Sequence, residues 1–429
     1  MKKKYRIILY TSIFLLCVVA SIILVVKKSN SVYEEESKPK VVKHKSMLST
    51  NLEQTAGAGD YKTVTQSKWP TEGYKFNAEL SRCENGSTLS WDDTKKAVIV
   101  SGNLSDKCYV YFDIYQPTLA EYIKSQYTGT QGDNALYYHN STLTNGAGDN
   151  SYRYAGANPN NFVCFGSDTS PCPTDNLYRI IGVFGENYHG VTGKQLVKLI
   201  KYDYMTTDEL GTDGDYSQTY KEWGMDSTYK GTYGDGERIG VYYWNYKATG
   251  SATNTWSTSL LNKTNLNTNF INNIGTTWAN KIATVTWKVG GNTYANISDV
   301  VPATTYQNEI VNPVTTNTTD NATTYSAKIG LMYVSDYGFA ASPDAWTLTM
   351  SSYNNTTATN NNWMYMGLYE WTISRTADYS DDAFYVYSDG FVDYDGVNSR
   401  DGVRASFSLE SSVSYVSGSG SMSDPIVIN

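Results

Sequence analysis

Histidine and cysteine are scarce in this chain of 429 residues, and their scarcity limits the chemistry that the sequence supports. The three histidines, His44, His139 and His189, lie in segments rich in polar and small residues. We interpret each as a solvated loop residue, and we find no Ser-His-Asp or Cys-His arrangement for nucleophilic catalysis. The sequence therefore predicts no catalytic residue set, no metal site and no cofactor.

The five cysteines predict two disulfides. Cys17 lies in an apolar run, which leaves four cysteines that allow three connectivities. Because Cys83 and Cys108 share one local segment and Cys164 and Cys172 share another, we predict these two pairs. A zinc site is the alternative, but the spacing lacks Cys-x-x-Cys and no histidine lies beside the cysteines. Disulfides of this kind form in exported proteins.

Basic residues are fewer than acidic ones, 34 against 42, and no basic footprint or groove-reading motif is present, which excludes a nucleic-acid partner. Six basic residues and no acidic residue lie within the first 28 positions, so the rest of the chain carries a net charge of −14. This charge would favour cations or basic ligands, although charge of this size also keeps a surface soluble.

Long hydrophobic runs are absent except for one, residues 7–26, which follows the basic segment 1–6. As a helix this run would span about 30 Å, the thickness of the hydrocarbon core of a bilayer. Lys27 and Lys28 follow it in place of a small-residue cleavage site, which favours an uncleaved transmembrane anchor over a cleaved signal peptide. The charges predict a cytoplasmic tail at 1–6 and an extracellular C-terminal body, hence a single-pass protein of the cell membrane with the membrane as a partner.

The composition changes several times between the anchor and the main domain. Residues 27–70 have few large apolar side chains and are predicted to form a flexible stalk. Residues 71–115 contain three strand-like runs, at 88–91, 97–101 and 109–114, and are predicted to form a small β module that the first disulfide closes. Residues 116–174 are predicted to be a Gly/Asn-rich connecting region, with one helix from Leu119 to Tyr127.

The main domain is predicted at residues 175–429. Leu177 to Phe184 and Gln195 to Lys201 are apolar runs joined by a polar loop, which is typical of a β-hairpin at the centre of a sheet. Residues 256–283 have helical spacing, and residues 328–334 have the composition of another strand. Few helices among many short strands and long loops predict an α+β fold.

Several segments of the chain resemble a family of uncharacterised, membrane-anchored surface proteins of low-GC Gram-positive bacteria and their relatives. The segments that carry this resemblance cover nearly all of the predicted extracellular part: 83–91, 105–113, 146–166, 175–204, 328–342, 370–375, 401–409 and 418–428. Glu370-Trp371-Thr372 and Gly402-Val403-Arg404 also look like the closing motif of the C-type-lectin-like fold as formylglycine-generating enzymes use it. The resemblance therefore implies a C-type-lectin-like domain at 175–429.

The chain departs from that family pattern in two respects. Formylglycine-generating oxidases depend on a cysteine pair in the C-terminal region, and no cysteine follows Cys172, which excludes their reaction. Family members usually carry Pro after Gly-Val-Arg, whereas this chain has Ala405 and Ser406. The second departure affects local stiffness and leaves the expected fold unchanged.

The segment 362–409 suggests how the domain would function. Strand-like runs such as 385–387 and 403–409 alternate there with Asp-Gly turns, and the turn side chains are tyrosines mixed with adaptable hydrogen-bonding groups. Recognition surfaces favour this mixture. We predict a surface-displayed binding protein that contacts a protein or glycan ligand through eight residues: Tyr385, Tyr387, Asp389, Asp393, Tyr394, Asp395, Asn398 and Arg400.

Other interpretations of the same segment stay open. An envelope enzyme acting on glycans would use Glu370 or a loop aspartate as acid or base, although a Glu at this position more often accepts hydrogen bonds from the core. A structural surface component would self-assemble. A variant of the binding hypothesis is diversification of residues 378–400 by a retroelement.

Two clusters of acidic residues have a weak likeness to a calcium loop: Asp393, Asp395 and Asn398, and Asp213 with Asp215. Neither matches the twelve-residue pattern, because Val397 occupies the fifth position after Asp393 and no Glu closes the loop. Turn formation is the better explanation of both clusters.

Overall fold

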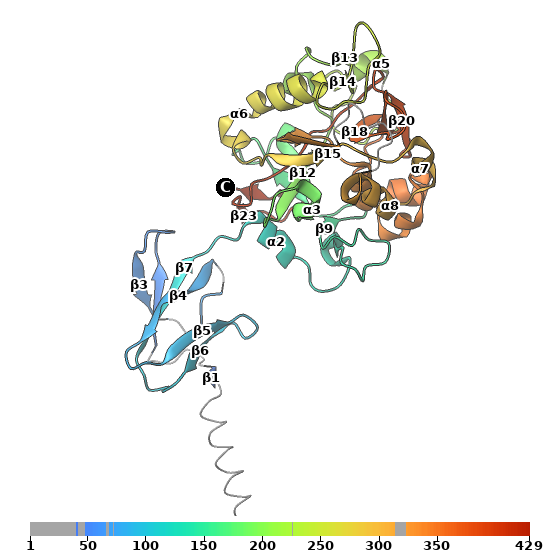
Figure 1. The fold of residues 1–429 in the computed structure, drawn as a ribbon. Coiled ribbons are helices and arrows are strands. Elements are labelled where there is room, and N and C mark those ends of the chain that lie inside the picture. Colours follow the sequence, from blue (N-terminus) through green and yellow to red (C-terminus); the bar gives the residue numbers. More distant parts are fainter. Residues whose placement is uncertain (1–39, 42–47, 66–67, 72, 225, 314–322) are drawn as a thin grey trace, which may run out of the picture. The chain divides into compact units, whose positions relative to one another are not determined.

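The computed structural model divides the chain into two compact units, Met1–Gln116 (unit 1) and Pro117–Asn429 (unit 2) (Figure 1). Each unit has its own hydrophobic core and is described by itself. The structure describes residues 40–41, 48–65, 68–71, 73–224, 226–313 and 323–429.

Unit 1 is built from two small sheets. The first has the order β3-β2-β7-β4, in which β2 and β7 are parallel and the other pairs antiparallel. Its strands are β2 (Leu48–Glu53), β3 (Tyr61–Val64), β4 (Tyr74–Cys83) and β7 (Cys108–Ile114). The second, of order β1-β6-β5, consists of β1 (Lys40–Val41), β5 (Thr88–Asp92) and β6 (Ala97–Ser101). Strands β5, β6 and β7 confirm the three strand-like runs of the predicted β module.

Strand β7 shows how this sequence forms a half-buried sheet. Cys108, Val110 and Phe112 are buried while the residues between them are partly exposed, which is the alternation of a strand with one covered face. Phe112 contacts the rings of Trp69 and Trp91 at 6.0 and 5.7 Å. These contacts form the centre of the unit 1 core.

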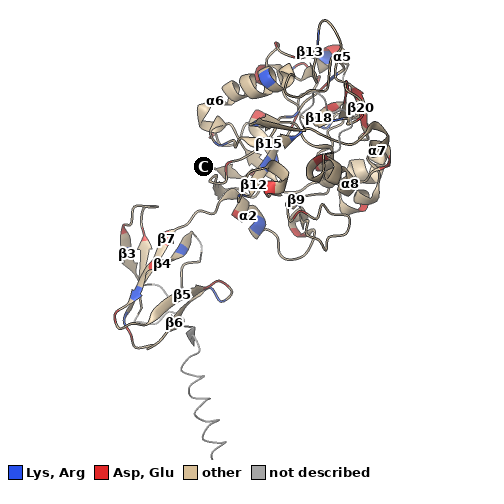
Figure 2. Ribbon diagram, in the orientation of Figure 1, with Lys and Arg blue, Asp and Glu red and all other residues tan. Residues whose placement is uncertain are grey.

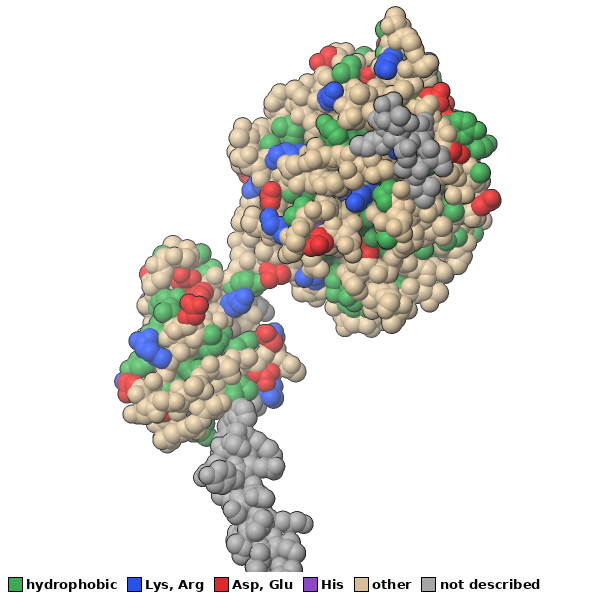
Figure 3. Space-filling view, in the orientation of Figure 1, with side chains coloured by type: hydrophobic (Ala, Val, Ile, Leu, Met, Phe, Trp, Pro, Cys, Tyr) green, Lys and Arg blue, Asp and Glu red, His purple; other side chains and the backbone are tan. Residues whose placement is uncertain are grey.

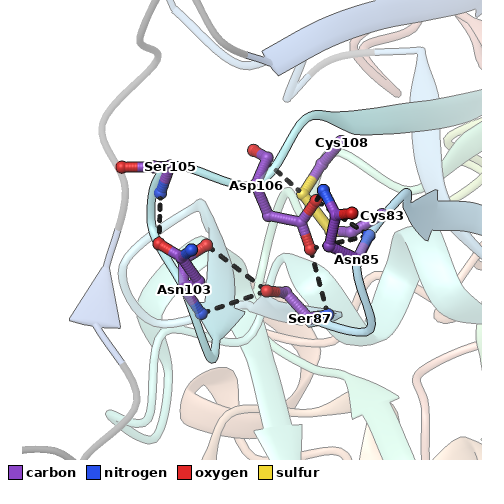
Figure 4. The surroundings of a disulfide bond; sticks show 7 residues. All are labelled: Cys83, Asn85, Ser87, Asn103, Ser105, Asp106 and Cys108. Carbon is purple, nitrogen blue, oxygen red and sulfur yellow. Dashed lines mark hydrogen bonds between the residues drawn. A yellow bond between two sulfur atoms is a disulfide. The ribbon is translucent and has the colours of Figure 1, made fainter.

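The disulfide Cys83–Cys108 confirms the first predicted pair and joins facing residues of β4 and β7. Figure 4 shows its surroundings, where the buried Asp106 accepts hydrogen bonds from the backbone N–H groups of Asn85 and Ser87. The loop before β7 is therefore fixed both covalently and by a satisfied carboxylate.

The prediction of a flexible stalk at 27–70 is wrong from Leu48 onward, because β2 and β3 lie in that range. Leu48 and Leu52 are the buried apolar side chains that β2 contributes to the core. Strand β2 gains further burial by lying between β3 and β7, and this pairing is not visible in the composition of the segment. Residues 27–39 and 42–47 lie outside the described residues.

The main sheet of unit 2 has the order β17-β22-β12-β11-β9-β8, and β10 also pairs with β11. Every residue of β11 (Leu177–Phe184) and β12 (Leu196–Lys201) is buried, which confirms the predicted central hairpin and explains their nearly continuous apolar sequence. The other strands are β8 (Leu136–Tyr138), β9 (Tyr152–Tyr154), β10 (Phe162–Cys164), β17 (Ile329–Gly330) and β22 (Ser406–Ser408).

Unit 2 therefore begins well before residue 175, the predicted start of the main domain. Strands β8, β9 and β10 come from the predicted connecting region 116–174 and pair within the main sheet. Each is three residues long, too short to leave a periodic signal in the sequence. The second predicted disulfide, Cys164–Cys172, is also confirmed and joins the last residue of β10 to the loop before β11.

Four smaller sheets complete unit 2, and two of them are central to the candidate site. One of these has the order β13-β14-β21 and the other the order β18-β19-β20. Their strands are β13 (Tyr216–Thr219), β14 (Gly240–Tyr243), β18 (Glu370–Arg375), β19 (Asp382–Val386), β20 (Val392–Gly396) and β21 (Arg400–Asp401). The remaining pairs are β15 (Val285–Lys288) with β16 (Thr324–Ala327), and β23 (Tyr415–Ser417) with β24 (Val427–Ile428).

The helices of unit 2 are short. The predicted helix at 119–127 is α2 (Leu119–Ser125), which begins with a capping box between Thr118 and Glu121. Residues 256–283 contain a π-helix, Leu261–Phe270, which continues into α6 (Ile271–Ala279) with a kink at Gly275, where φ is 75°. The others are α3 (Glu186–His189), α4 (Thr207–Leu210), α5 (Tyr220–Trp223), α7 (Tyr294–Asp299), α8 (Pro302–Tyr306), α9 (Val334–Ala340) and α10 (Thr356–Asn360), with a second π-helix at Gln307–Val311.

The predicted fold class is wrong: in place of an α+β fold with a C-type-lectin-like domain, the described residues form a β-rich structure of many small sheets. Strands account for 32% of the structure and helices for 22%, and the strands are divided among many small sheets. None of the helices within the described ranges is long and apolar enough to cross a membrane. The predicted span, residues 7–26, lies outside the described residues.

The composition explains why strands predominate. Tyr and Thr favour pleated, half-buried surfaces, whereas Asn, Thr and Gly are poor residues for the interior of a helix. Helices such as α5 consequently stop after about one turn, in that case at Gly224, where φ is 111°. The longest continuous helical segment of the described residues, 261–279, contains repeated Leu, Ile and Phe residues.

Candidate functional site

The C-terminal turns lie on a three-stranded sheet. Strands β18, β19 and β20 pair in sequence order, and the turn between β19 and β20 is closed by a hydrogen bond from Tyr387 N to Phe391 O. Gly390 in this turn has a φ of 105°, which only glycine adopts readily. This turn confirms one of the two turns that the Asp-Gly pairs predict. The other, at Asp393 to Gly396, is wrong, because these residues belong to β20.

A hollow of about 540 Å³ lies beside this sheet, and we refer to it as the aromatic hollow. It is lined by residues from α5, β14, the segment before β18, β19 and the turn after it, β20, and β21 with the turn before it. They are Trp223, Tyr243, Tyr369, Tyr385, Tyr387, Asp395, Asn398, Ser399, Arg400 and Asp401. Small-molecule sites have volumes of about 300 to 1,000 Å³, so the hollow is large enough for a ligand.

The aromatic side chains of the hollow contact one another in a continuous row. The ring centroid of Tyr369 lies 5.3 Å from that of Trp223 and 4.5 Å from that of Tyr387. Tyr385 packs against Trp371 at 5.9 Å, and the indole of Trp371 donates a hydrogen bond to Tyr242 O over 2.9 Å. The row is therefore supported by a buried and hydrogen-bonded second layer.

The polar side of the hollow contains an unusual carboxyl group, Asp401. Only 3% of this residue is exposed, and its Oδ2 atom has no hydrogen-bond partner among the residues that the structure describes. Burial, and after it the charge of Asp395, raises the pKa of Asp401 well above its usual value. Pairing of β21 with β14 places Asp401 opposite Tyr242 and fixes its backbone.

The structure brings together five of the eight predicted ligand-binding residues, because Tyr385, Tyr387, Asp395, Asn398 and Arg400 all line the hollow. Of these five, Asp395, Asn398 and Arg400 are exposed, Tyr387 is half-buried and Tyr385 is buried. Figure 2 shows acidic residues along β20, and Figure 3 shows a face of unit 2 made mainly of uncharged polar groups and backbone.

The remaining three predicted residues lie apart from the hollow lining. Asp389 is exposed in the turn before β20. Tyr394 packs edge to face against Tyr294 of α7 at 4.2 Å. Asp393 is half-buried, and its carboxylate accepts a hydrogen bond from Tyr394 N over 2.9 Å. The predicted single face is therefore divided between the hollow and the surface toward α7.

The sequence did not identify five residues that line the hollow: Trp223, Tyr243, Tyr369, Ser399 and Asp401. Trp223 and Tyr243 precede the predicted segment by more than a hundred positions and reach the hollow through the β14–β21 pairing. Asp401 was within that segment, next to the exposed Arg400, and the Asp-Gly pair Asp401-Gly402 is the signal that could have marked it.

Glu370, the candidate acid or base of the alternative hypothesis, forms a buried ion pair. The Nε and Nη2 atoms of Arg404 donate to its two carboxylate oxygens over 2.8 and 2.9 Å, and both side chains are almost completely buried. Glu370 does not line the aromatic hollow. Its position agrees with a role in the core and offers no route to a ligand.

The residues with a weak likeness to calcium loops have other partners. Asp215 accepts a hydrogen bond from Leu261 N over 2.8 Å, and Asp213 accepts one from the side chain of Asn269 over 2.6 Å. Across the described ranges, no group of three or more His, Cys, Asp or Glu side chains could hold a metal ion.

A second hollow, of about 510 Å³, lies beside Asp149, Glu186, Lys288 and Tyr306. The charged groups behind it are paired within the protein: Arg153 contacts Asp149 at 2.8 Å, and Lys198 contacts Asp336 at 2.5 Å. Tyr306 Oη at this second hollow also lacks a hydrogen-bond partner among the described residues, so an unpartnered atom alone does not separate the two hollows. We prefer the aromatic hollow because several aromatic rings and the unpartnered carboxyl group of Asp401 line it together.

No family model, curated protein or solved structure matches the chain. The resemblance to membrane-anchored surface proteins therefore stays a prediction. Any function proposed for the chain depends on the geometry of the hollow.

Proposed function

We propose that this protein is an extracellular recognition protein whose aromatic hollow binds a glycan. The observation that carries the proposal is that one hollow is lined both by five aromatic side chains, four of them in a continuous row of ring contacts, and by Asp395, Asn398, Ser399 and Arg400. Sugar rings present C–H groups on their faces and hydroxyl groups at their edges. Aromatic faces pack against the C–H groups, and amide, carboxylate and guanidinium groups form hydrogen bonds with the hydroxyl groups.

The rings of the aromatic row are already held in place before a ligand binds, which favours binding. Tyr369 and Tyr387 are half-buried, so each presents part of its ring to solvent while the rest is held by neighbours. Rings that are already fixed lose little side-chain entropy when a ligand binds. Tyrosine and tryptophan provide large contact areas at low entropic cost for the same reason.

The cellular location is part of the proposal. Two disulfides form between cysteines that are close in sequence, at separations of 25 and 8 residues. Disulfides persist in oxidising compartments and are rare in reducing ones. We therefore place the two units outside the cytoplasm, where surface glycans would be accessible.

A glycan array followed by calorimetric titration of the best ligand tests this proposal with the full chain. We expect Trp223→Ala and Tyr387→Ala each to weaken binding by about tenfold or more, since each removes one stacking surface worth about 1.4 kcal/mol or more. Tyr379→Ala is the matched control, because Tyr379 is exposed and does not line the hollow. Unchanged affinity in both hollow variants would contradict the proposal.

A further inference from the structure

One residue that lines the aromatic hollow, Asp401, has a side-chain oxygen without a hydrogen-bond partner among the described residues. Asp401 Oδ2 is enclosed by protein and receives no hydrogen bond from any residue in the described ranges. Leaving a buried polar group unsatisfied costs about 1 to 3 kcal/mol. A ligand group that donates a hydrogen bond at this point would remove that cost, so the hollow is built to favour a donor.

The electrostatics of the hollow favour a donor that is also positively charged. The titratable groups that face Asp401 are Asp395 from β20, Tyr220 from α5 and Tyr385 from β19. Arg400, its neighbour in β21, is the one cationic side chain among the described residues that lines the hollow, and it is exposed. Burial raises the pKa of Asp401, and a cationic ligand beside it would instead stabilise the ionised carboxylate.

We propose that the hollow selects a saccharide that carries a free, protonated amino group, which binds between the carboxyl groups of Asp401 and Asp395. This inference rests on the proposed function and names the chemical class of its ligand.

The aromatic row and the unmet acceptor together define this class. A cation over the face of Trp or Tyr is attracted by the ring quadrupole, and Trp223 and Tyr369 lie within one row beside the carboxyl groups. A quaternary ammonium group would use the rings but has no N–H to donate to Asp401. A neutral hydroxyl would donate to Asp401 but would bring no positive charge to the carboxyl groups of Asp401 and Asp395.

Two oligosaccharides that differ only in their amino groups test the inference: the fully deacetylated trisaccharide of glucosamine and its N-acetylated form. Both are titrated into the full chain at mildly acidic pH, where the free amine is protonated. We expect the deacetylated trisaccharide to bind at least about tenfold more tightly. Equal or weaker binding of this trisaccharide would overturn the inference.

Three substitutions locate the preference within the hollow. Asp401→Asn and Asp395→Asn should each reduce the preference for the deacetylated trisaccharide, whereas Arg400→Gln should increase it by removing a competing cation. Asp389→Asn is the control, since Asp389 is an exposed aspartate that does not line the hollow. Asp395 is exposed, so its variant keeps the test valid if Asp401→Asn fails to fold. A preference that survives both aspartate substitutions would overturn the inference.

The two proposals fail in distinguishable ways. Binding of a neutral glycan that Trp223→Ala and Tyr387→Ala abolish, without any preference for the amine, would overturn the inference and leave the proposed function standing. The absence of binding to any glycan on the array would overturn both.

Discussion

At the scale of single residues, two acids near the end of the chain have opposite surroundings. Glu370 is held by two hydrogen bonds from Arg404, whereas Asp401 Oδ2 has no partner among the described residues. The two lie on neighbouring segments, since Glu370 forms a bridge with Gly402. The carboxyl group of Glu370 therefore stabilises the fold, whereas we propose that the carboxyl group of Asp401 binds a ligand.

Glu370→Gln should destabilise the protein by about 3 kcal/mol or more. The substitution leaves the buried Arg404 without a counterion, and breaking a buried ion pair by removing one partner costs about 3 to 5 kcal/mol. Urea denaturation followed by tryptophan fluorescence measures the change. Glu237→Gln is the control, because Glu237 pairs with Lys221 on the surface and should change stability by less than about 1 kcal/mol. Equal effects of the two substitutions would contradict the structural role of Glu370.

At the scale of elements, local sequence patterns predicted some helices and strands of the fold and missed others. The central hairpin β11–β12 and helix α2 were predictable because each carries its own continuous or periodic apolar signal. Strands β2 and β14 were not, since their burial comes from partners distant in sequence. The same difference applies to the aromatic hollow: five of its lining residues from the C-terminal segment were predicted, and the contributions of α5 and β14 were missed.

The two disulfides should stabilise their surroundings to different extents. Loop-closure entropy for separations of 25 and 8 residues gives about 3.5 and 2.5 kcal/mol. Replacing Cys83 and Cys108 together by Ser should therefore accelerate amide hydrogen exchange in β4 and β7 more than replacing Cys164 and Cys172 accelerates it in β10 and β11. The reverse order would contradict this ranking.

At the scale of the whole molecule, unit 2 assembles the hollow from segments that the chain separates widely. Trp223 and Tyr243 precede the main part of the lining by more than a hundred positions, and sheets β13-β14-β21 and β18-β19-β20 bring them together with it. The hollow exists only in the folded unit, so the glycan binding that we propose should be lost when unit 2 unfolds.

A crystal structure of the full chain with the deacetylated glucosamine trisaccharide tests the central claim most directly. We predict a sugar ring stacked on Tyr369 or Tyr387 and an amino nitrogen within hydrogen-bond distance of Asp401 Oδ2. A trisaccharide bound instead in the second hollow, beside Asp149 and Tyr306, would contradict the claim that the aromatic hollow is the recognition site.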